Sequence, residues 1–184
     1  SFLTISLAFL RMALALRDAK IVGEDREHAR TDELTGLPNR RRFIAELELL
    51  RRKNGTLLLL DLDGFKAVND NYGHEIGDQL LKQITLRFNR VLPSDVFIAR
   101  LGGDEFGVIV YGNRNIGTDV ALALRATCTY PFTLSVGEVK VGVSIGSITT
   151  EGPTKSKEEL LKRADNAMYE AKRTGVGFVQ APTA

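Results

Sequence analysis

The sequence predicts an α+β protein with a mostly antiparallel central sheet flanked by helices. Three observations support this class. A short apolar run at 57–63 ends in acids, two β-rich runs at 96–99 and 107–111 are joined by a short Gly-containing segment, and helical patterns separate the strands. Two such runs around a short turn are typical of a β-hairpin, which pairs its strands antiparallel.

The helices are predicted from apolar spacing and from residues suited to helix ends. Asn39 is a suitable N-cap for the first helix, and Ser156 with Glu159 forms a capping box before the last. The predicted helices cover residues 40–53, 78–91 and 117–129, and a final helix follows Ser156. The residues expected to face the core are Phe43, Leu47 and Leu50; Leu80, Ile84, Phe88 and Val91; and Leu160, Leu161, Ala164, Ala167, Met168 and Ala171.

The remaining strands are predicted from β-branched and apolar runs. The run at 57–63 is expected to be a buried central strand, because it is almost continuously apolar before its acids. Residues 132–136 and 139–149 are expected to form strands around Gly137-Glu138. The polar stretch 64–77 is expected to be partly helical.

Residues 1–30 are predicted to form one helix that becomes charged after Arg17. The first 16 residues hold a single charge, Arg11, but are shorter than a full membrane span of about 20 residues. Leucines at heptad spacing leave a coiled-coil stalk and the end of a membrane helix as alternatives. We favour a dimerising signalling helix, linked to an upstream sensor or membrane domain. The expected division is a helix at 1–30, a catalytic domain at 31–180 and a tail at 181–184.

Composition and charge narrow the class of protein. The 184 residues are 43% hydrophobic and 26% charged, which is ordinary for a globular domain. A net charge of only +2 argues against a nucleic-acid binder that relies on a basic surface. The lone Cys128 excludes an internal disulfide and a cysteine-based zinc site, and it fits a cytoplasmic domain.

Two acidic segments form the candidate catalytic site. Asp61 ends the predicted central strand, and Asp104 lies at the tip of the predicted hairpin, where glycines allow a close approach of a large ligand. Each alone is also typical of an ordinary strand end or turn. Together they are the arrangement that metal-assisted phosphoryl and nucleotidyl transfer uses. We expect Asp63 to point away from Asp61 and to find a structural partner, with the 32–41 loop as one candidate.

Five motifs in order resemble the GGDEF domain, the diguanylate cyclase family, over about residues 30–178. The hairpin carries Gly102-Gly103-Asp104-Glu105-Phe106, and the central strand leads into Asp61-Leu62-Asp63-Gly64-Phe65-Lys66-Ala67-Val68-Asn69-Asp70. The other three motifs are Asp32 to Arg41, Tyr72 to Asp78, and Ala164 to Lys172. The resemblance implies a ferredoxin-like, palm-type fold similar to that of nucleotide cyclases and polymerases.

The resemblance implies condensation of two GTP into cyclic di-GMP with release of two pyrophosphates. Mg²⁺ or Mn²⁺ would be held by Asp61, Asp104 and the carbonyl of Leu62. Glu105 would either help deprotonate the attacking hydroxyl or order the hairpin. Lys66 and Lys172 match positions that touch the terminal phosphates.

The substrate would be selected by residues after the central strand. Asn69 and Asp78 match the family's guanine-recognition positions, although alone they would suit an Asx turn and a helix cap. The amides of Gly64 and Phe65 would bind phosphate as a nest of N–H groups. His74 is expected to hold this loop by a hydrogen bond.

Two departures from the family pattern stand out. Val176 occupies the position of an arginine that helps to bind phosphate, so we expect a raised KM for GTP; whether the replacement abolishes activity stays open. Pro93 and Val96 occupy the positions of the family's inhibitory Arg-x-x-Asp site. We therefore expect no product inhibition through that site.

Two further functions compete with an active cyclase. One is a GTP-binding module that regulates a neighbouring EAL-type phosphodiesterase domain, and the other is an interaction protein with a vestigial site. The intact acids favour the cyclase, which would work as a homodimer, because one domain binds one GTP. No nucleic-acid partner is expected, and the domain is placed in the cytoplasm, as part of an inner-membrane protein or free of it.

Overall fold

The chain divides into two units, Ser1–Arg30 and Thr31–Ala184, and the computed structural model describes residues 30–152 and 156–183. The predicted helix at 1–30 and its two alternatives therefore lie outside the described residues, apart from Arg30. Within the described part of the chain, no helix is both long and apolar enough to cross a membrane. The domain division stays a prediction.

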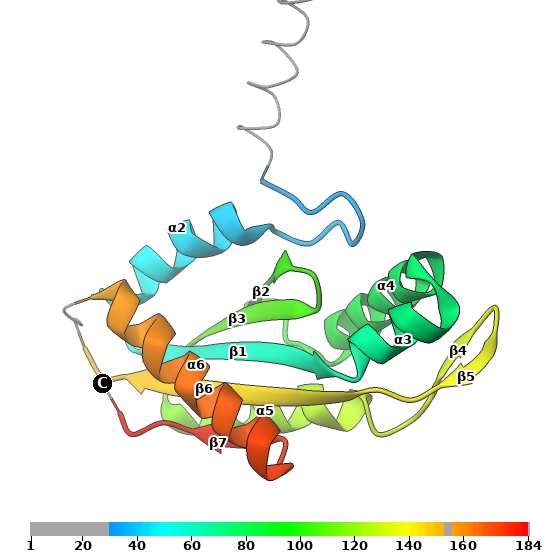
Figure 1. Ribbon diagram of the computed structural model, residues 1–184. Coiled ribbons are helices and arrows are strands. Elements are labelled where there is room, and N and C mark those ends of the chain that lie inside the picture. Colours follow the sequence, from blue (N-terminus) through cyan, green and yellow to red (C-terminus); the bar gives the residue numbers. More distant parts are fainter. Residues whose placement is uncertain (1–29, 153–155, 184) are drawn as a thin grey trace, which may run out of the picture. The chain divides into compact units, whose positions relative to one another are not determined.

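A five-stranded sheet forms the centre of the second unit, in the order β2-β3-β1-β6-β7 (Figure 1). Strands β2, β3, β1 and β6 pair antiparallel, and β7 pairs parallel with β6. A separate two-stranded ribbon holds β4 and β5. The predicted α+β class with a mostly antiparallel sheet is confirmed. The strands are β1 (Gly55–Asp63), β2 (Phe97–Gly102), β3 (Glu105–Tyr111), β4 (Phe132–Leu134), β5 (Gly137–Val139), β6 (Gly142–Thr150) and β7 (Phe178–Gln180).

Helices cover both faces of this sheet, and the two faces have separate apolar cores. The helices are α2 (Arg40–Leu50), α3 (Phe65–Tyr72), α4 (His74–Val91), α5 (Arg114–Thr127) and α6 (Lys157–Thr174). Leu57 and Leu59 of β1 belong to the cluster that includes residues of α2 and α6. Leu58, Leu60 and Leu62 belong to the cluster that includes residues of α3, α4 and α5. Side chains alternate along a strand, so β1 divides the two cores and is buried on both sides, as its apolar run predicts.

The two predicted N-caps are correct, whereas other predicted helix ends are shifted. Asn39 and Ser156 accept hydrogen bonds from the first backbone amides of α2 and α6, which confirms both caps. Helix α2 ends at Leu50, its last buried residue, rather than at Lys53. Helix α4 begins at His74 rather than at Asp78, because buried Ile76 extends the apolar stripe by one turn.

Three further predictions differ from the structure. Val91 is 41% exposed, because it lies in the last turn of α4, beyond the core. Helix α5 begins at Arg114, since Asn113 caps it. The predicted strand 139–149 is divided at 140–141, because Val139 pairs with Phe132 in the ribbon whereas β6 pairs with β1. Strand β7 was not predicted; three residues carry too little pattern, and the edge of β6 supplies their partner.

Candidate active site

The end of β1 and the β2–β3 hairpin bring the predicted acids together. Asp61 lies directly opposite Glu105 in the antiparallel pairing of β1 with β3. The Leu62 amide donates to the backbone carbonyl of Asp104 over 3.3 Å, so the hairpin tip is tied to the strand end. Gly102 and Gly103 form the turn at φ 145° and 52°. A side chain at either position would meet no neighbouring atom within 4 Å, so glycine is needed here for backbone conformation alone.

Asp63 shares a face of β1 with Asp61, and the prediction that it points away was wrong. The two residues are two positions apart in a regular strand, so their side chains point to the same side. The partner of Asp63 is also different from the expected candidate, because its carboxylate accepts a hydrogen bond of 2.8 Å from the Ser144 hydroxyl on β6. Ser144 lies opposite Asp61 in the β1–β6 pairing. The strand end is therefore more acidic on this face than the sequence led us to expect.

Lys172 provides the positive charge at this acidic strand end. Its ammonium group, in the last turn of α6, donates to both carboxylate oxygens of Asp61 at 2.8 and 2.9 Å. The hydrogen bond to Asp61 raises the pKa of Lys172 above its usual value, and the charges of Asp61, Asp63 and Asp104 act in the same direction. Lys172 is thus fully charged at neutral pH and faces a predicted metal ligand directly.

The environment of Asp104 disfavours the charged form of its carboxyl group. Burial raises the pKa of its carboxyl, and the nearby charge of Asp61 raises it further, against the opposing effects of a backbone hydrogen bond, Lys172 and Arg100. Two carboxylates that repel each other at a strand end favour a cation between them. This electrostatic coupling supports the pairing of Asp61 with Asp104 at one site.

The donor set fits Mg²⁺ brought in with a nucleotide. Among the described residues, no group of three or more His, Cys, Asp or Glu side chains is placed to hold a metal ion. Mg²⁺ is usually bound through one or two carboxylates together with substrate phosphates, whereas a closed protein cage is typical of other metals. Asp61, Asp104 and the Leu62 carbonyl match that open type of site.

Arg100 holds the hairpin in place, a role that our predictions did not include. Its guanidinium donates to the Gly103 carbonyl over 3.0 and 2.8 Å, and to the Asp32 carboxylate over 3.0 and 3.1 Å. Burial would raise the pKa of Asp32, but hydrogen bonds from Thr35 and Arg100 outweigh it and lower that pKa. The 32–41 loop is therefore connected to the residue before Asp104. The available signal was a cation two positions before the glycine pair.

The predicted nucleotide-selecting residues lie around the start of α3 and its junction with α4. Gly64 precedes α3 with φ 82°, and Phe65 is buried, whereas Lys66 is exposed. Asn69 is in α3, His74 is the first residue of α4, and Asp78 follows one turn later on an exposed position. The structure thus brings these residues to one pair of helices; their contacts with a ligand stay predictions.

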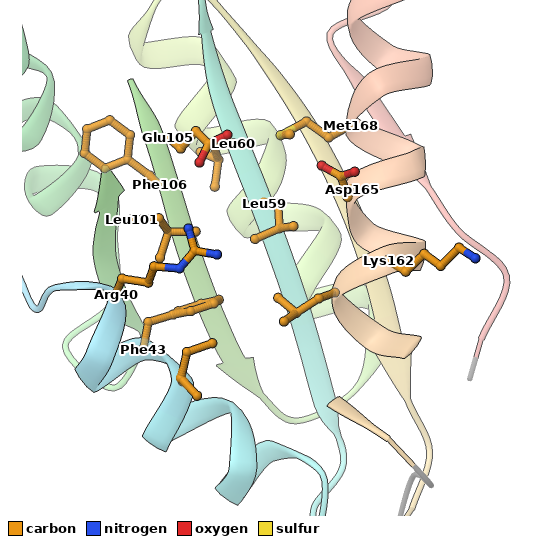
Figure 2. Close-up of a pocket in the computed structure, with 12 residues that line it drawn as sticks. Arg40, Phe43, Leu59, Leu60, Leu101, Glu105, Phe106, Lys162, Asp165 and Met168 are labelled. Carbon is orange, nitrogen blue, oxygen red and sulfur yellow. The ribbon is translucent and has the colours of Figure 1, made fainter. Parts of the chain in front are cut away.

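A cleft of about 450 Å³ lies beside the acids, between α2 and α6 (Figure 2). Figure 2 shows Arg40 and Phe43 of α2 on one side, Asp165 and Met168 of α6 on the other, and Leu59 of β1 between them. Of the predicted site residues, Glu105 lines this cleft, whereas Asp61 and Asp104 do not. Glu105 therefore lies between the acidic strand end and the cleft.

Comparison with known proteins agrees with this geometry. Residues 29–177 match the family described as diguanylate cyclase, GGDEF domain. The signaling protein YkoW of Bacillus subtilis is 42% identical over 154 residues, which cover 78% of this chain and 19% of YkoW. The response regulator PleD of Caulobacter vibrioides is 38% identical over 161 residues, which cover 81% of this chain and 35% of PleD. The chain thus spans much less than half of these relatives.

Solved structures share the fold. The GGDEF domain of PA1120 (YfiN or TpbB) from Pseudomonas aeruginosa matches with a TM-score of 0.75 and 33% identity, over 80% of this chain and 98% of that one. The coiled coil and GGDEF domain of DgcB from Caulobacter crescentus, in complex with c-di-GMP, matches with a TM-score of 0.73 and 29% identity over 100% of both chains. The predicted palm-type architecture is thereby confirmed, and the chain belongs to the diguanylate cyclase GGDEF domain family.

Proposed function

We propose that this domain condenses two GTP molecules into cyclic di-GMP and two pyrophosphates. The observation that carries the proposal is the junction of β1 with the hairpin, where Asp61 and Asp104 interact electrostatically beside the Leu62–Asp104 backbone hydrogen bond. In each half-reaction a 3′-hydroxyl oxygen forms a bond to the α-phosphorus of the other nucleotide. The bond from that phosphorus to the bridging oxygen breaks, and pyrophosphate leaves with the electron pair.

Different residues would bind the metal ion, hold the phosphates and act on the attacking hydroxyl. Asp61, Asp104 and the Leu62 carbonyl would hold Mg²⁺ or Mn²⁺. When bound, the ion would lower the pKa of the attacking hydroxyl and offset the negative charge of the phosphates. Lys66, Lys172 and the amides of Gly64 and Phe65 would hold the phosphate chain. Glu105 faces Asp61 across the strands, and either accepts the hydroxyl proton or orders the hairpin.

Guanine selection is assigned to Asn69 and Asp78. Guanine offers donors at N1 and at its 2-amino group, and an acceptor at O6, so an amide and a carboxylate complement its edge. Both residues lie at the α3–α4 junction. His74, which begins α4, is assigned to holding this junction.

The active form would be a homodimer, because each chain offers one such acid pair and the reaction joins two nucleotides. Two domains facing each other around a twofold axis would bring each hydroxyl to the other nucleotide's α-phosphate. Specific activity should therefore rise with protein concentration. A specific activity independent of concentration, from a protein that is monomeric in solution, would contradict this assignment.

The first test is GTP turnover with Mg²⁺, followed by chromatography of cyclic di-GMP, beside an Asp104→Ala variant. Product from the unmodified protein and none from the variant would support a cyclase that uses this acid pair. GTP binding that depends on Mg²⁺ but yields no product at any protein concentration would argue against it.

The second candidate is a GTP-binding module that controls a neighbouring phosphodiesterase domain, and Val176 is the observation that favours it. Val176 is 49% exposed and follows Gly175, the C-cap of α6, where the family pattern places a phosphate-binding arginine. Relatives include the bifunctional diguanylate cyclase/cyclic di-GMP phosphodiesterase MucR of Pseudomonas aeruginosa, of which this chain covers 22%. A cytoplasmic location suits both candidates, because both use GTP.

A further inference from the structure

The amide oxygen of Asn69 lies against the backbone of Gly77. Asn69 belongs to α3 and Gly77 to the first turn of α4, and Gly73 connects the two helices. The Gly73 amide donates to the Asn69 carbonyl over 2.9 Å, and the Gly73 carbonyl accepts from the Gly77 amide over 3.3 Å. These bonds fix the two backbones close together, and they leave the Asn69 side chain in the narrow space between them.

The position of this amide depends on packing rather than on hydrogen bonds. Its Oδ1 atom is buried and has no hydrogen-bond partner among the described residues. A buried polar atom without a partner is unfavourable, and no hydrogen bond to Oδ1 from the described part of the chain holds the amide in this orientation. The shape of the space around Asn69 is therefore what sets the direction of its amide group.

That space exists because residue 77 has no side chain. A Cβ atom at Gly77 would lie 2.0 Å from Oδ1 and 3.0 Å from Cγ of Asn69, and 3.3 Å from the Phe65 ring. Because Phe65 is itself buried, the asparagine amide would have to move. The requirement is not one of backbone conformation, since Gly77 is not among the glycines with positive φ, unlike Gly64 and Gly73. Glycine is otherwise a poor residue inside a helix.

We propose that Gly77 is a positioning residue for guanine recognition: by leaving room for the Asn69 amide, it sets the contact of that amide with the base. Asp78 follows Gly77 directly in α4, so the same turn carries the second guanine-reading group. The inference rests on the proposed function. It adds a specificity determinant that touches the nucleotide only through Asn69.

The test is binding of the α,β-methylene analogues of GTP and 6-thio-GTP, which cannot release pyrophosphate, measured by calorimetry with Mg²⁺. Because Oδ1 of Asn69 is buried against Gly77, the amide offers the base its N–H group, which can donate to O6 of guanine. 6-Thio-GTP keeps the N1 and 2-amino donors but carries sulfur, a weak acceptor, in place of O6, so the ratio of the two affinities reports this contact. Gly77→Ala should lower the affinity for the GTP analogue by about tenfold, the loss of one hydrogen bond. The affinity for the 6-thio analogue should fall much less, so the ratio falls.

A double-mutant cycle separates positioning from general damage. Asn69→Ala should lower the ratio to the level of Gly77→Ala. The double variant should bind both analogues like Asn69→Ala alone, and its melting temperature should be at least as high as that of Asn69→Ala. Losses that multiply in the double variant would overturn the proposal, because they would mean that the two residues act independently.

Gly117→Ala is the matched control. Gly117 is also a buried helical glycine, and a Cβ there would lie 2.4 Å from the Thr56 hydroxyl, away from the nucleotide-selecting residues. It should lower the melting temperature and leave the affinity ratio unchanged. An equal drop of the ratio in this control would overturn the assignment to Gly77. If the unmodified protein binds neither analogue, the proposed function itself fails, and the inference fails with it.

Discussion

The two ends of the candidate site are held in place by different forces. At the acidic end, Lys172, Ser144 and Arg100 connect the strand end and hairpin by hydrogen bonds and ion pairs. At the α3–α4 junction, the buried Asn69 oxygen has no described hydrogen-bond partner, and the space at Gly77 determines where it lies. Substitutions that change charge should therefore disturb the acidic end most, and substitutions that change side-chain volume should disturb the α3–α4 junction most.

Asp61→Asn should have the largest effect. It removes one of the two carboxylates assigned to the metal and the partner of Lys172, while the volume stays nearly the same. We expect a loss of turnover of at least about 100-fold, because metal stabilisation of the reaction contributes several kcal/mol. Steady-state kinetics at saturating GTP measure it, with Asp119→Asn as control, because Asp119 is an exposed residue of α5. Turnover within a factor of three of the unmodified protein would remove Asp61 from the site.

Arg100→Ala tests the hydrogen bonds that hold the hairpin. The Arg100 and Asp32 side chains are 12% and 23% exposed, so solvent screens them little. Loss of the guanidinium leaves the Asp32 carboxylate and the Gly103 carbonyl without these donors, which should cost about 2 kcal/mol of unfolding free energy. Urea unfolding measures this, with Arg90→Ala at the end of α4 as control. Equal losses of unfolding free energy in both variants would mean that the hydrogen bonds of Arg100 to Asp32 and Gly103 do not stabilise the fold.

Val176→Arg should restore a phosphate contact. We expect a KM for GTP lowered by about tenfold, the lower range for a hydrogen bond to a charged group. Leu49→Arg is the matched control, because Leu49 is 51% exposed near the end of α2, where its neighbour Leu50 packs at Gly55, the end of β1 opposite to the acids. An unchanged KM in Val176→Arg, or the same decrease in the control, would contradict a phosphate role for this position.

Lys172→Gln should change two affinities in opposite directions. Without nucleotide, removal of the ammonium group frees the Asp61 carboxylate, so Mn²⁺ should bind about threefold more tightly; the effect is modest because the lysine side chain is 49% exposed. GTP affinity should fall, because a phosphate contact is lost. Mn²⁺ binding by electron paramagnetic resonance and GTP titration measure the two. Lys162→Gln, exposed on the same helix, should change neither, and a fall of both affinities would contradict the ion pair's role.

The smallest effects concern stability against pH. The raised pKa of Asp104 means that the folded state binds its proton more readily than the unfolded state. Asp104 therefore destabilises the fold as pH rises from the ordinary value of 3.8 through the raised one, and Asp104→Asn should stabilise the protein at pH 7.

Asp32 should behave in the opposite way. Its lowered pKa gives stability that is present above 3.8 and lost as pH falls through the folded value, so Asp32→Asn should destabilise at pH 7. For each variant, the difference in unfolding free energy from the unmodified protein should shrink toward zero once the pH lies below the carboxyl's pKa in both the folded and the unfolded state. Urea unfolding at pH 7 and pH 3 compares them, and the same sign for both variants at pH 7 would contradict the assigned environments.

The sequence by itself determined the fold class, the hairpin, the central strand, the caps at Asn39 and Ser156, and the acids at 61 and 104. These follow from local patterns: the period of apolar residues, the conformational needs of turns, and motif spacing. The family match and the α+β sheet confirm that these local signals agree with one another.

Only the tertiary structure decided which partners these residues have. Ser144 reaches Asp63, Lys172 reaches Asp61 and Arg100 reaches Asp32 across 81, 111 and 68 positions of sequence. Strand register and helix packing set such pairs, and no local pattern encodes them. The same is true of β7, whose three residues form a strand because β6 has an open edge, and of Gly77, whose missing side chain matters because α3 lies against it.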